Sequence, residues 1–278
     1  MMKEYLSSLL FVLFFTHCSK PFDGTQNDAS KVEKPGWQLL WSDEFDSAGL
    51  PDTSKWRYDV GGHGWGNQEL QFYTESRLEN ARVHDGKLII EARRESWEGM
   101  NYTSTRLITK NKGDWTYGLF EIRAKLPSGR GTWPAIWMLP TEWNLGSGSW
   151  PDNGEIDIME HVGFEPGWVH GSVHTKKYYW QIGTQKTAKI QVADAQTAFH
   201  VYTLEWSPEK IQVGVDTTKY FSFTNEGAGW EVWPFGKNFH LLLNIAVGGA
   251  WGGVQGVDDS IFPQKMEVDY VRVYRKAE

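Results

Sequence analysis

The sequence predicts an all-β fold, an antiparallel sandwich of two sheets in which one concave sheet can carry a long groove. About fourteen segments have the length, residue types or alternation of strands. Hardly any segment has the apolar period of an amphipathic helix, and no repeat of fixed period occurs. The 278 residues do not separate into two blocks of different composition, so a single large domain is expected.

The composition restricts the class of partner. The net charge is −7 and no run of Lys or Arg stands out, which argues against nucleic acid and anionic membrane as partners. The chain has 29 Gly, 16 Trp, 11 Tyr and 14 Phe, which suits many strands joined by tight turns. Aromatic surface is then left over for a flat ligand such as a pyranose ring. We expect a monomer.

The first 18 residues are typical of an export signal. An apolar run from 5 to 15 follows one Lys and is too short to span a bilayer as a stable helix. Cys18 is the only cysteine, so no intrachain disulfide is possible. The segment resembles a bacterial lipoprotein signal, in which Cys18 is lipidated and anchors the protein at the cell surface or outer membrane. A secretory signal with an incidental Cys18 is the alternative, since His17 stands where a small residue is usual, and the product would then be secreted or periplasmic.

A polar linker and a first strand follow. Residues 19–35 have almost no apolar periodicity and predict a flexible tether before a domain that covers 36–278. Residues 37–46 predict a strand, and 51–56 a loop. Residues 61–67 contain four glycines without the strand-then-helix setting of a phosphate loop. We expect them to form the tight rim of a cleft.

Apolar or alternating segments predict the remaining strands. A hairpin turn with Asp85 and Gly86 joins two of them. Trp133 and Trp137 are four residues apart, so on a strand they share a face. A polar stretch runs from 176 to 191. Besides the first strand and the acidic strand described next, the predicted strands are 69–74, 78–83, 88–93, 102–109, 117–126, 132–139, 168–175, 201–206, 211–216, 220–223, 239–247 and 266–274.

Three carboxylates, Glu155, Asp157 and Glu160, lie within six residues on a background of Ile and Met. In a regular strand Glu155 and Asp157 share one face, whereas Glu160 points the other way. A β-bulge at Ile158 and Met159 would return Glu160 to the face of the other two, and such bulges cluster beside active sites. The backbone distance between the two Glu residues is then about 13 Å, which two inward-leaning side chains can reduce.

Such a row suits a retaining glycosidase, whose two carboxyl groups lie about 5 to 5.5 Å apart. Three like charges on one patch cannot all ionise cheaply, so at least one proton is held to higher pH, as a general acid requires. We assign that proton to Glu160 and attack on the anomeric carbon to Glu155. Asp157 can hydrogen-bond Glu155 and pass charge or proton between the two. A solvated acidic strand face is the alternative, but the Trp-rich neighbouring segments favour a sugar cleft.

Five segments, 67–74, 117–137, 154–163, 170–175 and 244–253, carry a resemblance to glycoside hydrolase family 16 and, within it, to the laminarinase-like β-1,3-glucanases. The resemblance extends from about Trp37 to Tyr274. It implies a β-jelly roll of the concanavalin type with a groove over its concave sheet. It also implies retaining hydrolysis, with Glu155 as nucleophile, Asp157 as its helper and Glu160 as acid/base.

The resemblance further implies sugar contacts. Stacking suits such sites because a pyranose presents an apolar C–H face to a ring while its hydroxyls stay free for hydrogen bonds. The matching residues are a stacking platform of Trp133 and Trp137, an aromatic on the far wall, Trp251, and three groups that hold hydroxyls, Asn67, Arg106 and His174. Two simpler interpretations stay open: Trp137 as a core residue and Arg106 as a surface cation.

No metal is expected in catalysis, because residues four apart on a strand face, such as His170 and His174, lie about 13 Å apart, too far for one ion. By resemblance, a structural calcium ion is expected on the convex side, held by Glu44, the carbonyl of Gly86 and Asp269. Hard oxygen ligands from separate strands suit calcium and would fasten the first and last strands. A solvated Asp269 is the alternative.

The sequence and the resemblance therefore predict an exported endo-β-1,3-glucanase that cleaves laminarin-type glucans with retention. Mixed-linkage β-1,3-1,4-glucan and an algal galactan of the agarose type are alternative substrates, because loops lining a shared groove decide which chains fit. A noncatalytic glycan-binding jelly roll is the alternative from another class. The presence of all three acids favours the enzyme.

Overall fold

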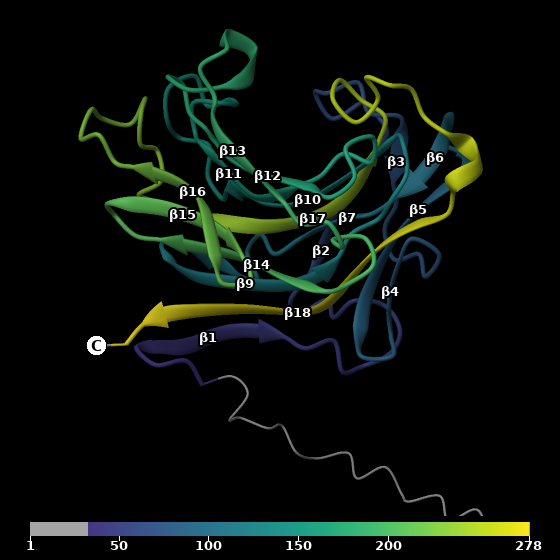
Figure 1. Ribbon diagram of the computed structural model, residues 1–278, viewed down its shortest axis with the longest axis horizontal. Helices are drawn as coiled ribbons and strands as arrows, with labels where there is room; N and C mark the ends of the chain where they lie inside the picture. Colours follow the sequence, from purple (N-terminus) through teal and green to yellow (C-terminus); the bar gives the residue numbers. More distant parts are fainter. Residues whose placement is uncertain (1–32, 278) are drawn as a thin grey trace, which may run out of the picture. The chain divides into compact units, whose positions relative to one another are not determined.

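The computed structural model describes residues 33–277, and these form two packed β-sheets with two short 3-10 helices, η2 (Trp180–Ile182) and η3 (Asp259–Ile261) (Figure 1). The predicted two-sheet sandwich is confirmed. The export signal, Cys18 and the linker up to residue 32 lie outside the described residues. Within 33–277, no helix is long and apolar enough to cross a membrane.

One sheet has ten strands, with the long strand β18 near its centre. All its described pairings are antiparallel except that of β3 with β6. Its path runs through β16 (Thr218–Thr224), β15 (Lys210–Val215), β14 (His200–Trp206), β9 (Gly118–Lys125), β18 (Gln264–Lys276), β5 (Lys87–Trp97), β6 (Met100–Ser104) and β3 (Gln71–Tyr73), while β1 (Trp37–Asp43) pairs with β18 and β4 (Ala81–His84) with β5.

The other sheet has eight strands and its middle strands, β11 and β10, include the acidic segment and the Trp133–Trp137 segment. In Figure 1 it curves, and loops rise above it at both sides. Its path runs through β13 (Lys186–Gln191), β12 (Trp168–His174), β11 (Glu155–Glu160), β10 (Thr132–Pro140), β17 (Phe239–Val247), β7 (Arg106–Ile108) and β2 (Arg57–Asp59), while β8 (Asp114–Trp115) pairs with β17.

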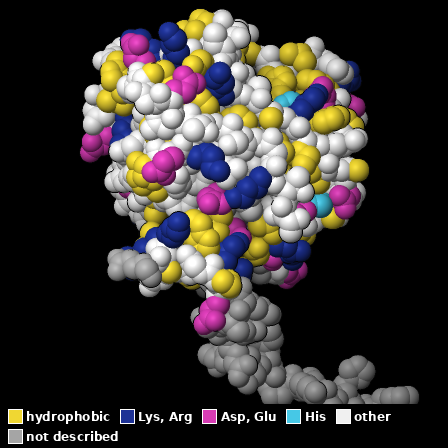
Figure 2. Space-filling view, turned by 60° about the vertical axis from the view of Figure 1, so that its left-hand side comes forward, with side chains coloured by type: hydrophobic (Ala, Val, Ile, Leu, Met, Phe, Trp, Pro, Cys, Tyr) yellow, Lys and Arg dark blue, Asp and Glu magenta, His cyan; other side chains and the backbone are white. Residues whose placement is uncertain are grey.

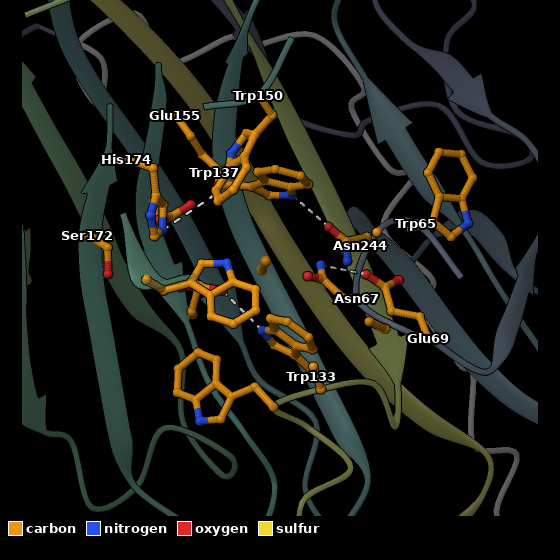
Figure 3. Close-up of a pocket in the computed structure, with 18 of the residues that line it drawn as sticks. Trp65, Asn67, Glu69, Trp133, Trp137, Trp150, Glu155, Ser172, His174 and Asn244 are labelled. Atoms are coloured by element: carbon orange, nitrogen blue, oxygen red, sulfur yellow. Dashed lines mark hydrogen bonds and ion pairs between the residues drawn. The ribbon is translucent and has the colours of Figure 1, made fainter. Parts of the chain in front are cut away.

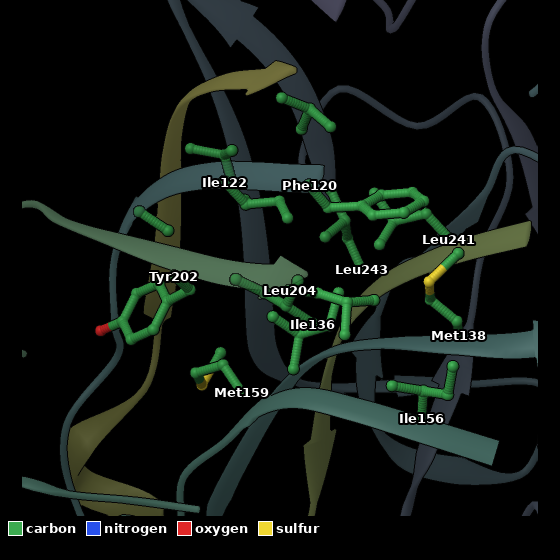
Figure 4. Close-up of a cluster of buried hydrophobic side chains, with 14 of the residues drawn as sticks. Phe120, Ile122, Ile136, Met138, Ile156, Met159, Tyr202, Leu204, Leu241 and Leu243 are labelled. Atoms are coloured by element: carbon green, nitrogen blue, oxygen red, sulfur yellow. The ribbon is translucent and has the colours of Figure 1, made fainter. Parts of the chain in front are cut away.

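Side chains from both sheets fill the space between them (Figure 4). Phe120 and Ile122 come from β9, Ile136 from β10, and Leu241 and Leu243 from β17, and all five are fully buried. Each such side chain stabilises the fold by about 1.5–3 kcal/mol relative to an exposed one. Because side chains alternate along a strand, the same eight-stranded sheet presents its other face outward.

Two predictions about strands were wrong. The segment 102–109 was expected as one strand, but it divides at the buried Thr105 into β6 and β7, which belong to different sheets. No Gly or Pro marks that crossing in the sequence. The polar stretch 176–191 contains β13, a strand that pairs on one side only with β12. A strand at the edge of a sheet needs little apolar surface, so its residues can be mostly polar and give no apolar signal of a strand.

The turn predicted at 84–87 is confirmed, since it joins β4 to β5 with Asp85 at φ 52° and Gly86 at φ 67°. Two consecutive left-handed residues are what a two-residue hairpin of this kind requires.

Acidic and basic side chains are interspersed on the face of the molecule drawn in Figure 2. This face therefore does not gather the positive charge that binding to nucleic acid requires.

Candidate active site

The acidic strand β11 contains the predicted bulge. Between Asp157 and Glu160, three residue steps on β11 oppose two steps on β12. The register with β10 shifts at the same place. Ile158 and Met159 are both fully buried, so two consecutive side chains face the core and Glu160 returns to the opposite face.

The three acids line a cleft of about 670 Å³ over the outward face of the eight-stranded sheet (Figure 3). Every substrate contact predicted from the sequence lies in this cleft as well. Those residues are Asn67, Arg106, Trp133, Trp137, His174 and Trp251. The glycine-rich segment 61–67 contributes His63, Trp65, Gly66 and Asn67, so the prediction that it forms a rim of the cleft is confirmed.

Glu155 is held between an indole and an imidazole. Trp150 Nε1–H donates a hydrogen bond to Glu155 Oε2 at 2.9 Å. His174 Nε2 lies 3.8 Å from Glu155 Oε1 and 3.4 Å from Asp157 Oδ2. The Trp150 and His174 rings also contact each other, with centroids 5.6 Å apart. These contacts orient Glu155 within the row.

Glu160 receives one hydrogen bond from the predicted stacking platform. Trp133 Nε1–H donates to Glu160 Oε1 at 3.1 Å. The Trp133 ring meets the edge of Trp251 at a centroid distance of 5.6 Å, and Trp251 in turn meets His170 at 4.9 Å. Trp251 thus packs against the residues around Glu160.

Burial raises the pKa of all three acids, because the charged form loses its hydration. For Glu160 the pKa rises to about 8, first through burial and then through the charge of Asp157. For Glu155 burial again comes first, followed by the charge of Asp157, while His174 and the Trp150 hydrogen bond act in the opposite direction. The pKa of Glu155 and that of Asp157 rise to about 8 as well, so the three carboxyl groups together hold protons at neutral pH, and position rather than pKa distinguishes the acid from the nucleophile.

Trp137 on β10 and Arg106 on β7 form one packed unit, on the side of the catalytic row away from β12. Trp137 Nε1–H donates to Asn244 Oδ1 at 2.7 Å. The Arg106 guanidinium lies 4.7 Å from the Trp137 ring centroid and 4.8 Å from that of Trp65. Arg106 is 9% exposed and its Nε lies 3.0 Å from a carboxylate oxygen of Asp59. Trp137 thus faces the cleft, and Arg106 is a buried cation between two aromatic rings.

Sequence reasoning missed Glu69, a buried carboxylate at the edge of this unit. It accepts hydrogen bonds from Gln71 at 2.7 Å, from Tyr73 at 3.2 Å and from Asn67 at 3.3 Å. Burial raises its pKa. Asn67, Glu69, Gln71 and Tyr73 are spaced by two residues, and that alternation of polar groups was the available signal.

Trp150 was also missed as a site residue, although it directly precedes the acidic segment. Its contact with Glu155 depends on how the chain from 150 to 155 turns back, which spacing alone does not reveal.

One set of metal-type donors lies within the described residues: Glu155, Asp157 and His174 have ligand atoms within 4.8 Å of one another. The wide spacing of His170 and His174 along one strand does not separate these three residues, because they come from two neighbouring strands. A carboxylate pair hydrolyses a glycoside without a metal. Catalysis without a metal stays a prediction.

The side chains expected to hold calcium are engaged by arginines. Glu44 accepts hydrogen bonds from Arg272 at 2.9 and 2.7 Å, and Asp269 Oδ2 pairs with Arg123 Nη1 at 2.5 Å. Gly86 lies in the β4–β5 turn. A calcium ion bound through Glu44 and through Asp269 Oδ2 would require these ion pairs to open.

The chain is similar to known proteins over most of its length. Residues 68–272 match the family model "Glycosyl hydrolases family 16". "Beta-glucanase" from Rhodothermus marinus is 64% identical over 249 residues, which cover 88% of this chain and 87% of that protein. The laminarinase structure from the same organism aligns with a TM-score of 0.86 at 64% identity, covering 87% of this chain and 98% of that one. "Glucan endo-1,3-beta-glucosidase" from Cryptopygus antarcticus is 40% identical over 252 residues, covering 85% and 91%.

Proposed function

The chain belongs to glycosyl hydrolase family 16, and we propose that it is an endo-β-1,3-glucanase that hydrolyses internal bonds of laminarin-type glucans with retention. The observation that carries the proposal is the bulged strand β11, which places Glu155, Asp157 and Glu160 together in an aromatic-lined cleft. The names of the similar proteins, a laminarinase among them, support the β-1,3-glucan substrate.

In the first step, a Glu155 oxygen attacks the anomeric carbon and the glycosidic C–O bond breaks. Glu160 transfers its proton to the departing oxygen, so that the leaving chain departs as a neutral alcohol. The raised pKa of Glu160, about 8, keeps that proton available at neutral pH, while His174 and the Trp150 hydrogen bond favour the ionised form of Glu155, which is the form that attacks. The product is a covalent ester between Glu155 and the sugar.

In the second step, Glu160, now ionised, takes a proton from water, and the water oxygen displaces Glu155 from the anomeric carbon. One bond is hydrolysed, one water is consumed, and both carboxyl groups return to their starting protonation. Because each step inverts the anomeric carbon, the released sugar has the configuration of the substrate.

Asp157 and Trp150 act on Glu155 rather than on the sugar. Two buried carboxyl groups in contact share a proton more cheaply than they carry two charges, so the hydrogen bond between Asp157 and Glu155 lets a proton pass from Glu155 to Asp157 and leaves Glu155 ionised. Trp150 donates a second one to Oε2. Both bonds favour the anion that attacks.

The test compares reducing-sugar release from laminarin, mixed-linkage β-glucan and agarose by the wild type and by Glu155→Gln. We expect preferential cleavage of laminarin and loss of at least about 1000-fold in the variant, because the nucleophile is gone. Activity confined to mixed-linkage glucan or agarose would keep the mechanism and overturn the substrate. Binding to a glycan without hydrolysis would assign the chain to the noncatalytic class.

We also propose that the protein is exported and lipid-anchored through Cys18, which the lipoprotein-like segment before it supports. Cys18→Ala should move the protein from the membrane fraction to the soluble fraction. An unchanged distribution would refute the anchor.

The calcium site is proposed separately and catalysis does not require it. If calcium replaces the arginine pairs of Glu44 and Asp269, a chelator lowers the melting temperature. If the ion pairs persist, the chelator has no effect and the calcium proposal fails.

A further inference from the structure

We propose that the segment between β12 and β13 forms a sugar-binding platform on the side of the catalytic row opposite Arg106, with Trp180 as its stacking residue. The proposal rests on the proposed function and adds the part of the cleft that binds the far portion of a long glucan.

The strand order defines two sides of the cleft. The acids lie on β11, and β10, β17 and β7, which provide Trp137, Asn244 and Arg106, follow on one side. On the other side lie β12 and then β13. The segment that joins these two strands rises above the curved face of the sheet in Figure 1 and carries η2. Trp180 and Gln181, within η2, line the cleft.

Trp180 is exposed where an indole is usually covered. Its exposed fraction is 47%, so part of its aromatic face is open to a ligand in the cleft. Ile182, on the same turn, is 52% exposed but is not among the residues lining the cleft. The two side chains thus share a turn but differ in their relation to the cleft.

The turn that carries Trp180 is fixed by its own hydrogen bonds. Gly183 N–H donates to the Trp180 carbonyl at 3.0 Å, and Gly183 adopts φ 70°. Thr184 Oγ1 accepts from Tyr179 N–H at 3.2 Å and donates to the Lys177 carbonyl at 2.9 Å. An indole presented by such a turn loses little further freedom when a sugar stacks on it.

Polar groups line the same side of the cleft, as a sugar requires. Gln185 Nε2 donates to Ser172 Oγ at 3.1 Å, and Ser172 Oγ donates to Thr187 Oγ1 at 2.9 Å. All three residues line the cleft with Gln181. An aromatic face for the C–H side of a pyranose and amide and hydroxyl groups for its edge make a carbohydrate site rather than a purely apolar one.

The platform is joined to the catalytic row. The Tyr179 ring meets Trp150 at a centroid distance of 5.6 Å and an interplanar angle of 88°. Trp150 donates to the nucleophile Glu155. A chain that spans the acids therefore continues onto Trp180 along one cleft.

The test measures kcat and KM on laminarin and the cleavage positions in laminarihexaose labelled at its reducing end. For Trp180→Ala we expect KM to rise roughly 2- to 10-fold with kcat nearly unchanged, as loss of one stacking contact predicts. Cleavage positions should shift in the opposite direction to those of Arg106→Ala, because the two residues hold opposite ends of the chain. Ile182→Ala is the matched control and should behave as wild type.

The proposal is overturned if Trp180→Ala keeps the wild-type KM and cleavage positions, or if its cleavage shifts in the same direction as that of Arg106→Ala. An equal effect of Ile182→Ala also overturns it, since that result indicates damage to the turn. Failure of the proposed function is distinct: the wild type then releases no sugar from laminarin. In that case, calorimetric titration with laminarihexaose still decides, because a working platform binds more weakly after Trp180→Ala and equal affinities refute it.

Discussion

The two faces of the eight-stranded sheet have opposite chemistry although the same strands make both. Toward the core, Ile156, Ile158 and Met159 are fully buried among apolar neighbours. Toward the cleft, the same strand presents Glu155 and two further acids whose pKa values burial has raised. The core face stabilises the fold, and that stability offsets the free energy cost of keeping carboxyl groups poorly hydrated. The bulge is what allows one short strand to serve both purposes.

The largest expected effect is the loss of activity when an acid on the cleft face is replaced. Glu160→Gln removes the proposed proton donor, and kcat/KM on laminarin should fall about 100- to 10,000-fold. An aryl glucoside with a strongly acidic leaving group needs no proton and should lose far less. Equal losses on both substrates, measured by initial rates, would contradict the role of Glu160 as general acid.

Met159, the residue before Glu160, tests how much the core face contributes to stability. Met159→Ala leaves a cavity and should lower the free energy of unfolding by about 2–5 kcal/mol, measured by denaturant titration. The activity of the folded fraction should change little. Met159→Leu keeps the volume and should cost less than about 1.5 kcal/mol. A large loss of kcat in folded Met159→Ala would show that the two faces are not separable.

The free energy cost of burying Glu160 depends on pH. The folded pKa of Glu160 is raised to about 8, so the folded state keeps a proton that the unfolded state releases near pH 4.5. Its contribution to stability is therefore complete below about pH 4.5 and is lost as pH rises toward 8. Glu160→Gln should match the wild type in unfolding free energy near pH 4 and exceed it by up to about 3 kcal/mol at pH 7. A difference independent of pH would contradict the raised pKa.

The smallest effect concerns orientation within the cleft. Trp137→Phe keeps an aromatic face but loses the hydrogen bond to Asn244. We expect KM on laminarin to rise about threefold, in line with one net hydrogen bond. Trp97→Phe, an exposed position on β5 of the other sheet, serves as control. No change in Trp137→Phe would show that the indole N–H has no part in orienting the ring.

The bulge and the cleft-facing row could be predicted because strand periodicity is strict. An odd spacing between Asp157 and Glu160 has few physical solutions, and one extra residue is the simplest. The stacking residues could be placed on the cleft by the resemblance and by the same periodicity. These predictions concern which face a residue occupies, and the strand pairings confirm them.

Contacts between segments distant in sequence were beyond such reasoning. That Trp133 donates to Glu160, or that Arg106 is enclosed by Trp65 and Trp137, depends on side-chain directions across three different elements. The division at Thr105 was missed for a similar reason. Both halves of that segment have strand character, and only the partners they find, β5 and β17, reveal that they belong to different sheets.

The bulge places Glu155 and Glu160 on one face, where we propose that they act as nucleophile and acid/base. Proton NMR of the first sugar released from laminarin, recorded before mutarotation, is the sharpest test of these two roles. Double displacement predicts that the β-anomer appears first and that the α-anomer grows only as mutarotation proceeds. Initial release of the α-anomer would mean a single displacement by water and would contradict the account.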